Sequence, residues 1–297
     1  MRKLTKSLPV VLACAALAMT ASTSGAAAAG STRGLEIAVP AYVYPGDPML
    51  TGVQSASPAP AIVILNPNSG NDPFDGPWQA RADSLRTATT TAGGGHTKVL
   101  GYVDTARGAR PLADVKVTID NYLKTADHKL HVDGIFFDQS GRDCGTGNAT
   151  RDYYAALRSY VQETVYALDH QAEELVVDNP GTAVADCYLE PGHRTADTFV
   201  TFEGSYAAYT GGGWLGGNVF NYTVGYYSGA TLDPSGTSFW HLVHATPDAT
   251  AMHTALDTAF DRGAGYAYAT DDVMINPWDA SPSWGFQAET SYAATLG

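Results

Sequence analysis

Two acidic residues stand at the ends of apolar runs that have the composition of buried β-strands. The run Asp133-Gly134-Ile135-Phe136-Phe137-Asp138 ends in Asp138, and the run Thr198-Phe199-Val200-Thr201-Phe202-Glu203 ends in Glu203. Barrel enzymes keep their catalytic groups at the carboxyl ends of strands, so this placement predicts a shared site for both acids. A glutamate is also a poor helix N-cap, which argues against a purely structural role for Glu203.

Most enzymes that cleave glycosidic bonds use a pair of carboxyl groups. One group protonates the leaving oxygen while the other attacks the sugar or activates water. The two carboxyl groups lie about 5 Å apart in enzymes that retain the anomeric configuration and farther apart in enzymes that invert it. We assign Asp138 as nucleophile and Glu203 as acid/base, with the opposite assignment as the alternative. The two acids lie two strands apart, about 9 to 10 Å between backbones. Side chains that converge from this spacing could reach either separation, so the sequence leaves the stereochemistry open.

Strand-like and helix-like segments alternate along the chain, which indicates a parallel sheet with crossover helices. The strand candidates are continuous apolar runs, typical of a sheet covered on both faces; there are eight, at 35–39, 61–66, 98–104, 132–138, 175–179, 198–203, 238–245 and 265–270. Apolar residues at helical spacing predict helices over 115–126, 154–168 and 252–260, the last with Asp248 as N-cap, and a weaker one over 75–90. Glycines after Glu203 predict a long loop. The fold class is therefore α/β, a single (β/α)8 TIM-type barrel, with an open doubly wound sheet as the alternative.

Other polar and aromatic side chains near the predicted strand ends form the candidate substrate-binding set. Sugars are held by aromatic faces and by hydrogen-bonding groups at their edges. The candidates are Tyr42, Asn66, Asp104, Gln139, Asn179, Tyr206, Trp240 and Asp271. The competing interpretation is that the acids and amides cap turns and the aromatics pack in the core, Trp240 especially because it lies within a strand. The histidines are scattered without metal-ligand spacing, so neither a metal nor a cofactor is expected.

The first 29 residues have the composition of a secretory signal. Arg2, Lys3 and Lys6 precede a short apolar stretch, Leu8 to Met19, and small residues follow at Ala26 to Ala29. We expect residues 1–29 to be removed and residues 30–297 to form one barrel domain. With no other apolar stretch long enough to span a membrane, we expect a secreted, extracellular monomer.

The charge and the cysteines restrict the partners and the compartment. Without the leader, 14 Lys and Arg face 30 Asp and Glu, a formal charge of −16, which makes nucleic acid an unsuitable partner. The acidity serves solubility, or alternatively forms a groove that attracts a cationic polymer. Cys144 and Cys187 then remain, and an even pair in an exported chain predicts a disulfide.

Several motifs together resemble one known family. They are Pro40-Ala41-Tyr42-Val43-Tyr44-Pro45, Ile64-Leu65-Asn66-Pro67-Asn68-Ser69-Gly70, Val99-Leu100-Gly101-Tyr102-Val103-Asp104-Thr105, Asp133-Gly134-Ile135-Phe136-Phe137-Asp138 and Phe202-Glu203-Gly204-Ser205-Tyr206. They are similar to the spherulation-specific, spherulin-4-like family, over nearly the whole predicted mature chain. The resemblance implies a β/α-barrel, endo-acting and retaining hydrolase of galactosamine- or N-acetylgalactosamine-containing polysaccharide. It also implies that the acids at Asp138 and Glu203 carry catalysis.

The sequence departs from the family pattern at Gln139, where many relatives carry a second acid. Because adjacent strand residues point to opposite faces, we expect Asp138 and Gln139 to have different roles and Asp138 to serve alone with Glu203. The departure keeps a second function class open, a non-catalytic carbohydrate-binding or cell-surface barrel protein.

Overall fold

The computed structural model describes residues 34–190, 192–211, 220–221, 226–227 and 238–297. The predicted leader, residues 1–29, lies outside these residues, as does most of the glycine-rich segment expected as a loop. In the described part, no helix is both long enough and apolar enough to cross a membrane.

Eight parallel strands close into a barrel in the order β1-β10-β9-β6-β5-β4-β3-β2, which confirms the predicted fold class. The barrel strands are Glu36–Ala41 (β1), Ile62–Leu65 (β2), Lys98–Asp104 (β3), Gly134–Asp138 (β4), Leu175–Asp178 (β5), Thr198–Ser205 (β6), Ser238–His244 (β9) and Tyr266–Ala269 (β10). Each corresponds to a strand predicted from an apolar run. The residues Phe220–Asn221 (β7) and Tyr226–Tyr227 (β8) form a separate two-stranded sheet.

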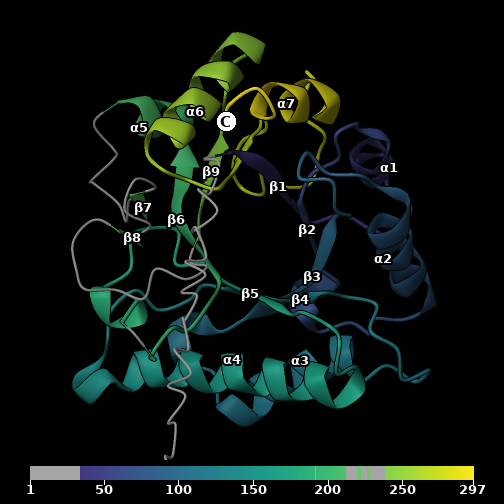
Figure 1. Cartoon of the computed structure of the whole chain (residues 1–297), viewed down its shortest axis with the longest axis vertical. Coiled ribbons are helices and arrows are strands. Elements are labelled where there is room, and N and C mark those ends of the chain that lie inside the picture. Colours follow the sequence, from purple (N-terminus) through teal and green to yellow (C-terminus); the bar gives the residue numbers. More distant parts are fainter. Residues whose placement is uncertain (1–33, 191, 212–219, 222–225, 228–237) are drawn as a thin grey trace, which may run out of the picture. The chain divides into compact units, whose positions relative to one another are not determined.

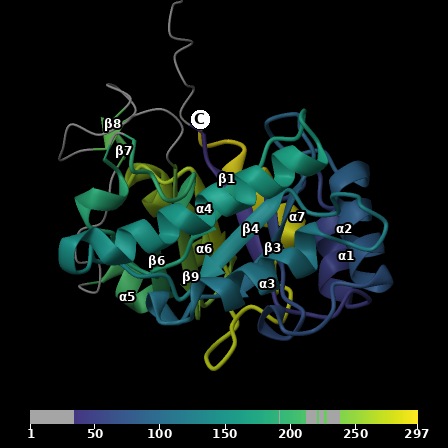
Figure 2. The same cartoon turned by 90° about the horizontal axis from the view of Figure 1, so that it is seen from below.

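Helices lie outside the ring of strands, as Figures 1 and 2 show. They are Pro48–Ser55 (α1), Gly76–Ala88 (α2), Leu112–Leu123 (α3), Ala149–Leu168 (α4), Tyr206–Thr210 (α5), Ala249–Asp261 (α6) and Phe286–Ala293 (α7). The three helices predicted from apolar periodicity are confirmed as α3, α4 and α6, and the weaker one as α2. The predicted N-cap of α6 is also confirmed, because the Asp248 carboxylate accepts a hydrogen bond from the Ala251 N–H.

The connections differ from the ideal repeat in two places. Between β5 and β6, the described residues contain a short 3-10 turn, Asp186–Tyr188, in place of an α-helix. After β6 the short helix α5 follows directly. Both departures fall beside β5 and β6, the strands that lead to Asn179 and Glu203.

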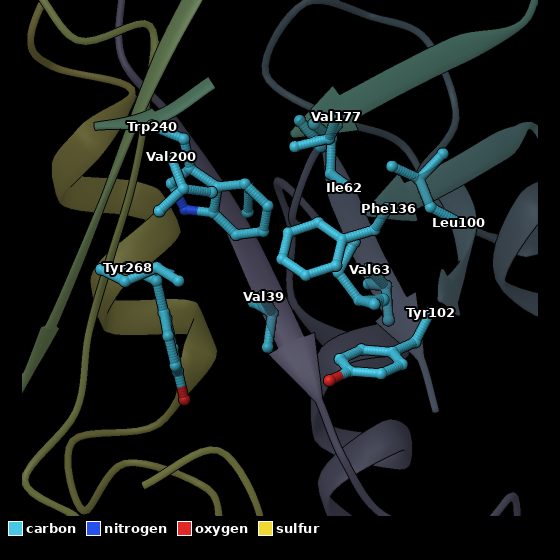
Figure 3. Close-up of a cluster of buried hydrophobic side chains, with 14 of the residues drawn as sticks. Val39, Ile62, Val63, Leu100, Tyr102, Phe136, Val177, Val200, Trp240 and Tyr268 are labelled. Carbon is cyan, nitrogen blue, oxygen red and sulfur yellow. The ribbon is translucent and has the colours of Figure 1, made fainter. Parts of the chain in front are cut away.

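The interior of the barrel is filled by alternate side chains from the strands. Figure 3 shows Leu100, Phe136, Val200 and Trp240 among this cluster. Trp240 is 0% exposed and packs edge-on against Phe136 at 5.8 Å between ring centroids. Trp240 therefore belongs to the core, and its predicted role as a sugar-binding surface is wrong.

A β-bulge changes the direction of side chains partway along β6. Val200 pairs with Trp240 of β9, but Phe202 pairs with the next residue, His241, so that Thr201 is the extra residue. Beyond the bulge, Glu203 pairs with Leu242 and takes the side that faces the barrel interior, while Phe202 packs outside against Tyr209. Bulges near active sites commonly re-aim a side chain in this way. Without the bulge, strict alternation along the same residues from Val200 would place Glu203 outside.

Candidate active site

The side chain of Asn179 joins the two acids predicted from the sequence. Its amide nitrogen donates hydrogen bonds to Asp138 Oδ1 at 2.7 Å and to Glu203 Oε2 at 2.9 Å. The Asn179 side-chain oxygen accepts from the Gly181 backbone N–H at 2.9 Å, which fixes the orientation of the amide. Asn179 is buried, so this bridge lies inside the mouth of the barrel rather than on its rim.

The shared nitrogen limits the distance between the carboxyl groups. Asp138 Oδ1 and Glu203 Oε2 can be no farther apart than the two hydrogen bonds laid end to end, at 2.7 and 2.9 Å. This limit lies below the roughly 6.5 Å at which inverting glycosidases begin and is compatible with the roughly 5 to 5.5 Å of retaining ones. The distance between the two carboxyl groups, which the sequence left open, is therefore short.

Each acid also has a donor of its own. The Tyr102 hydroxyl donates to Asp138 Oδ2 at 2.5 Å, and the indole N–H of Trp278 donates to Glu203 Oε1 at 3.2 Å. Tyr102 comes from β3, and Trp278 from the segment between β10 and α7. Donors from three separate parts of the barrel end, β3, the residue after β5 and the segment after β10, thus hold the acids of β4 and β6 in position.

Burial raises the pKa of both carboxyl groups. For Asp138, the hydrogen bonds from Tyr102, the Gln139 backbone and Asn179 oppose this rise. For Glu203, burial has the largest effect, the bonds from Asn179 and Trp278 oppose it, and the Asp138 charge adds to it. Glu203 is nevertheless open to solvent on one side, and water there limits the rise. Asp138 has the larger set of donors to its ionised form, which favours Asp138 as the carboxylate and Glu203 as the acid.

A groove of about 830 Å³ lies beside the pair, on the side of β1, β2 and β3. Three of the predicted substrate-binding residues line it: Tyr42, Asn66 and Gln139. Tyr102 also lines the groove and packs against Tyr42 at 5.3 Å, so the groove leads to Asp138. The outer wall is apolar, with Tyr44 78% and Ile275 93% exposed.

Gln139 occupies a position that strand alternation did not predict. It follows the last residue of β4 and has a φ of 46°, in the left-handed region. Alternation applies only within a strand, so Gln139 is not forced to the face opposite Asp138 and instead lines the groove. The alternation argument therefore does not apply at Gln139, and the expectations that Gln139 differs in role from Asp138 and contacts the substrate stay predictions.

Three other predicted residues have structural partners and do not line the groove. The Asp104 carboxylate accepts from the Ala106 N–H at 2.8 Å, the turn-capping role that was its alternative. The Asp271 carboxylate accepts from the Ser283 N–H at 3.0 Å and so fastens the segment that carries Trp278. Tyr206 begins α5 and is half-buried against the core.

Tyr102 and Trp278 are the site residues that sequence reasoning did not assign to the acids. The position of Tyr102 could have been predicted. It lies two residues before Asp104, on the same face of β3, and Asp104 pairs with Asp138 on the neighbouring strand. For Trp278 the sequence shows only an aromatic residue in a loop. Its contact with Glu203 spans 75 residues of chain and depends on the path of that loop.

The predicted disulfide is confirmed next to this site. Cys144 and Cys187 are bonded, with their Cα atoms 6.1 Å apart. Cys144 lies in the loop after β4 and Cys187 in the 3-10 turn after β5. The bond therefore ties together the two loops that follow Asp138 and Asn179.

Comparisons with known proteins agree with this fold. The model of spherulation-specific family 4 matches residues 36–290. Spherulin-4 of Physarum polycephalum is 31% identical over 168 residues, which cover 54% of this chain and 43% of that protein, so the match spans less than half of its length. The crystal structure of Aspergillus clavatus Sph3 in complex with GalNAc has a TM-score of 0.64 and 21% identity, over 89% of this chain and 98% of that one.

At 21% identity the likeness to Sph3 establishes the fold alone. The family match reaches further, because residues 36–290 contain every strand of the barrel, both carboxyl groups and their donors. The chain therefore belongs to spherulation-specific family 4.

Proposed function

We propose that this protein is a secreted, endo-acting glycoside hydrolase of polysaccharide that contains galactosamine or N-acetylgalactosamine. The observation that carries the proposal is the single Asn179 nitrogen bonded to both Asp138 and Glu203. Two carboxyl groups this close, at the ends of β4 and β6, match the arrangement of retaining glycosidases. The sugar class is supported by the Sph3 structure, whose bound molecule is GalNAc.

In the proposed mechanism, ionised Asp138 attacks the anomeric carbon while Glu203 gives its proton to the leaving glycosidic oxygen. The glycosidic bond breaks and a covalent ester forms between Asp138 and the sugar. Glu203, now ionised, takes a proton from a water molecule, which attacks the anomeric carbon and releases Asp138. The raised pKa of Glu203, caused chiefly by burial, favours its protonated form for the first step.

The groove fits an internal stretch of a polymer. Its lining combines aromatic side chains with amides, including Tyr44, Trp78, Asn66 and Asn68. Aromatic faces pack on sugar rings, and amides bond their hydroxyl groups. Tyr44 and Ile275 on the outer wall are exposed, so the groove is open to solvent on that side, which supports endo cleavage.

Mass spectrometry of products from partially deacetylated galactosaminogalactan tests the proposal. An endo-glycosidase should release a series of oligosaccharides with new reducing ends, each bearing galactosamine or N-acetylgalactosamine beside the cut. Polymer that is bound but not shortened would instead support the non-catalytic binding protein. Products that end only in other sugars would reject the proposed specificity but would still support hydrolase activity.

Replacement of Tyr102 by phenylalanine should move the acidic limb of the kcat/KM pH profile to higher pH. The hydroxyl stabilises ionised Asp138, so its loss raises the pKa of that carboxyl group further, and the nucleophile must be ionised to attack. A hydrogen bond to a charged group is worth about 1.5–3 kcal/mol, so kcat/KM near the limb should fall about 10- to 100-fold.

Tyr122→Phe is the matched control for Tyr102→Phe. The Tyr122 hydroxyl donates to the Tyr102 carbonyl and contacts neither acid, so its removal should leave the limb in place. An unchanged pH profile in Tyr102→Phe would remove Asp138 from the nucleophile role.

Salt should weaken the binding of deacetylated polymer more than that of acetylated polymer. The amines of the deacetylated form are cationic, and Asp72 lines the groove that leads to Asp138. Exposed charges are screened over roughly 8 Å at physiological ionic strength, so added salt should raise KM for the deacetylated polymer only.

Asp72→Asn should reduce that salt dependence. Glu163→Gln, which removes an exposed acid from α4 outside the groove, should leave it unchanged. Asp271, whose carboxylate holds Ser283, is not suited to this test. Equal salt responses for the two polymers would assign the acidity of the chain to solubility.

A further inference from the structure

A second pocket, of about 460 Å³, opens at the same end of the barrel and is separate from the groove. Its walls come from the segments after β3, β4 and β5, and they include Arg107, Ser140, Arg142, Asp143 and Pro180. Ser140 lies two positions after Asp138, and Pro180 directly follows Asn179. The pocket therefore adjoins the carboxyl pair on the side away from β1 and β2.

Two arginines without acid partners meet in this pocket. Among the described residues, the arginines that pair with acids are Arg86, Arg151, Arg158 and Arg194. Arg107 and Arg142 are not among them, and both are exposed. In a chain with 30 acids against 17 Lys and Arg, acid partners are abundant, so two unpaired guanidinium groups in one pocket indicate a site for an anion.

Ser140 supplies a further polar group. It is 4% exposed, and within the described part of the chain its hydroxyl oxygen is buried with no hydrogen-bond partner. Buried hydroxyl groups are normally bonded. This oxygen is covered in the described structure, so it can bond a ligand only after the Ser140 side chain turns, and the anion site is inferred from the two arginines.

The walls are held in place without a ligand. The Ser140 N–H donates to the Asn179 carbonyl and the Ala185 N–H donates to the Arg142 carbonyl, each at 2.8 Å. The Arg107 N–H donates to the Gln139 carbonyl at 2.7 Å. Cys144, which forms the disulfide with Cys187, is the residue directly after Asp143. A pocket fastened in this way loses little entropy when it binds.

We propose that this pocket binds the carboxylate of an acidic sugar residue, as a subsite beside the carboxyl pair. The proposal rests on the proposed function in one respect, that the ligand is a carbohydrate. The planar guanidinium groups match the two oxygens of a carboxylate. Asp143, whose carboxylate accepts from the Gly145 N–H, lines the same pocket and favours a single negative charge over a dianion such as phosphate.

Isothermal titration with trigalacturonate and with neutral galactotriose tests the subsite. The full chain should bind the acidic trimer about tenfold more tightly than the neutral one, a difference of about 1.4 kcal/mol. Arg107→Gln and Arg142→Gln should each remove most of this preference. Lys98→Gln is the matched control, because Lys98 is an exposed cation at the amino end of β3, at the opposite end of the barrel.

Three results would overturn the subsite. They are equal affinity for the two trimers, an undiminished preference in both arginine variants, or an equal loss of preference in Lys98→Gln. Inorganic phosphate that binds as tightly as trigalacturonate and displaces it would show a general anion site and reject the sugar. Hydrolysis of N-acetylgalactosamine polymer is measured in the same variants. If it persists while the acidic trimer fails to bind, the subsite is wrong and the proposed function stands.

Discussion

Asp138→Asn and Glu203→Gln should each lower kcat for hydrolysis of N-acetylgalactosamine polymer by about 10²- to 10⁴-fold, the usual contribution of a positioned acid or base. Both carboxyl groups lie in the mouth and share the Asn179 amide, so each substitution keeps the shape of the site and removes only the charge or the proton. Reducing-end release from polymer measures the loss. Retention of most of the wild-type rate in Glu203→Gln would reject the two-acid assignment.

Binding of polymer should survive these substitutions. The catalytic acids act chiefly in the transition state, whereas the groove that holds the chain is lined by other residues, such as Tyr44 and Trp78. Gln139→Ala is the matched control, because Gln139 adjoins Asp138 without contacting either carboxyl group through a side-chain hydrogen bond among the described residues. It should alter KM more than kcat. A loss of kcat in Gln139→Ala equal to that in Asp138→Asn would instead show that position 139 is part of the catalytic machinery.

Loss of the disulfide should lower the free energy of unfolding by about 4 kcal/mol, because the bond closes a 43-residue separation. The variant Cys144→Ser with Cys187→Ser allows the unfolded chain more conformations, while the backbone bond from Ala185 to Arg142 still joins the two loops. Urea unfolding followed by circular dichroism measures the difference as a lower midpoint.

A reductant provides the control for this stability difference. It should destabilise the wild-type protein to the level of the double variant and should leave the double variant unchanged. Equal midpoints for the oxidised wild type and the double variant would show that the loops are held without the bond.

The sequence predicts the barrel because each of its strands is buried on both faces and so appears as an uninterrupted apolar run. The long helices are predicted for a related reason, since α3, α4 and α6 each bury one apolar stripe. The short helices α1 and α7 have too few turns to show such a stripe. For α1 a signal was present, because Asp47 caps it and Pro48 opens it.

The site is predicted less completely than the fold. That Asp138 and Glu203 lie at one end of the barrel follows from their positions at strand ends. Their close approach depends on Asn179, for which the sequence also allowed a purely turn-forming role. Trp278 reaches Glu203 from a distant loop, and no local pattern reports that path. Trp240 shows the converse error, because an aromatic residue near a strand end in sequence can lie a full layer below the mouth.

The bulge at Thr201 has a consequence for how relatives of this chain are judged. A relative that carries the same residues without the bulge would exchange Phe202 and Glu203 between the two faces of β6, because side chains alternate along a strand. An aromatic ring would then fill the mouth and the acid would leave it. A relative could thus lose turnover through a change in the pairing of this strand alone, even though both acids still align, and a survey that checks only residue identity would count it as an active enzyme.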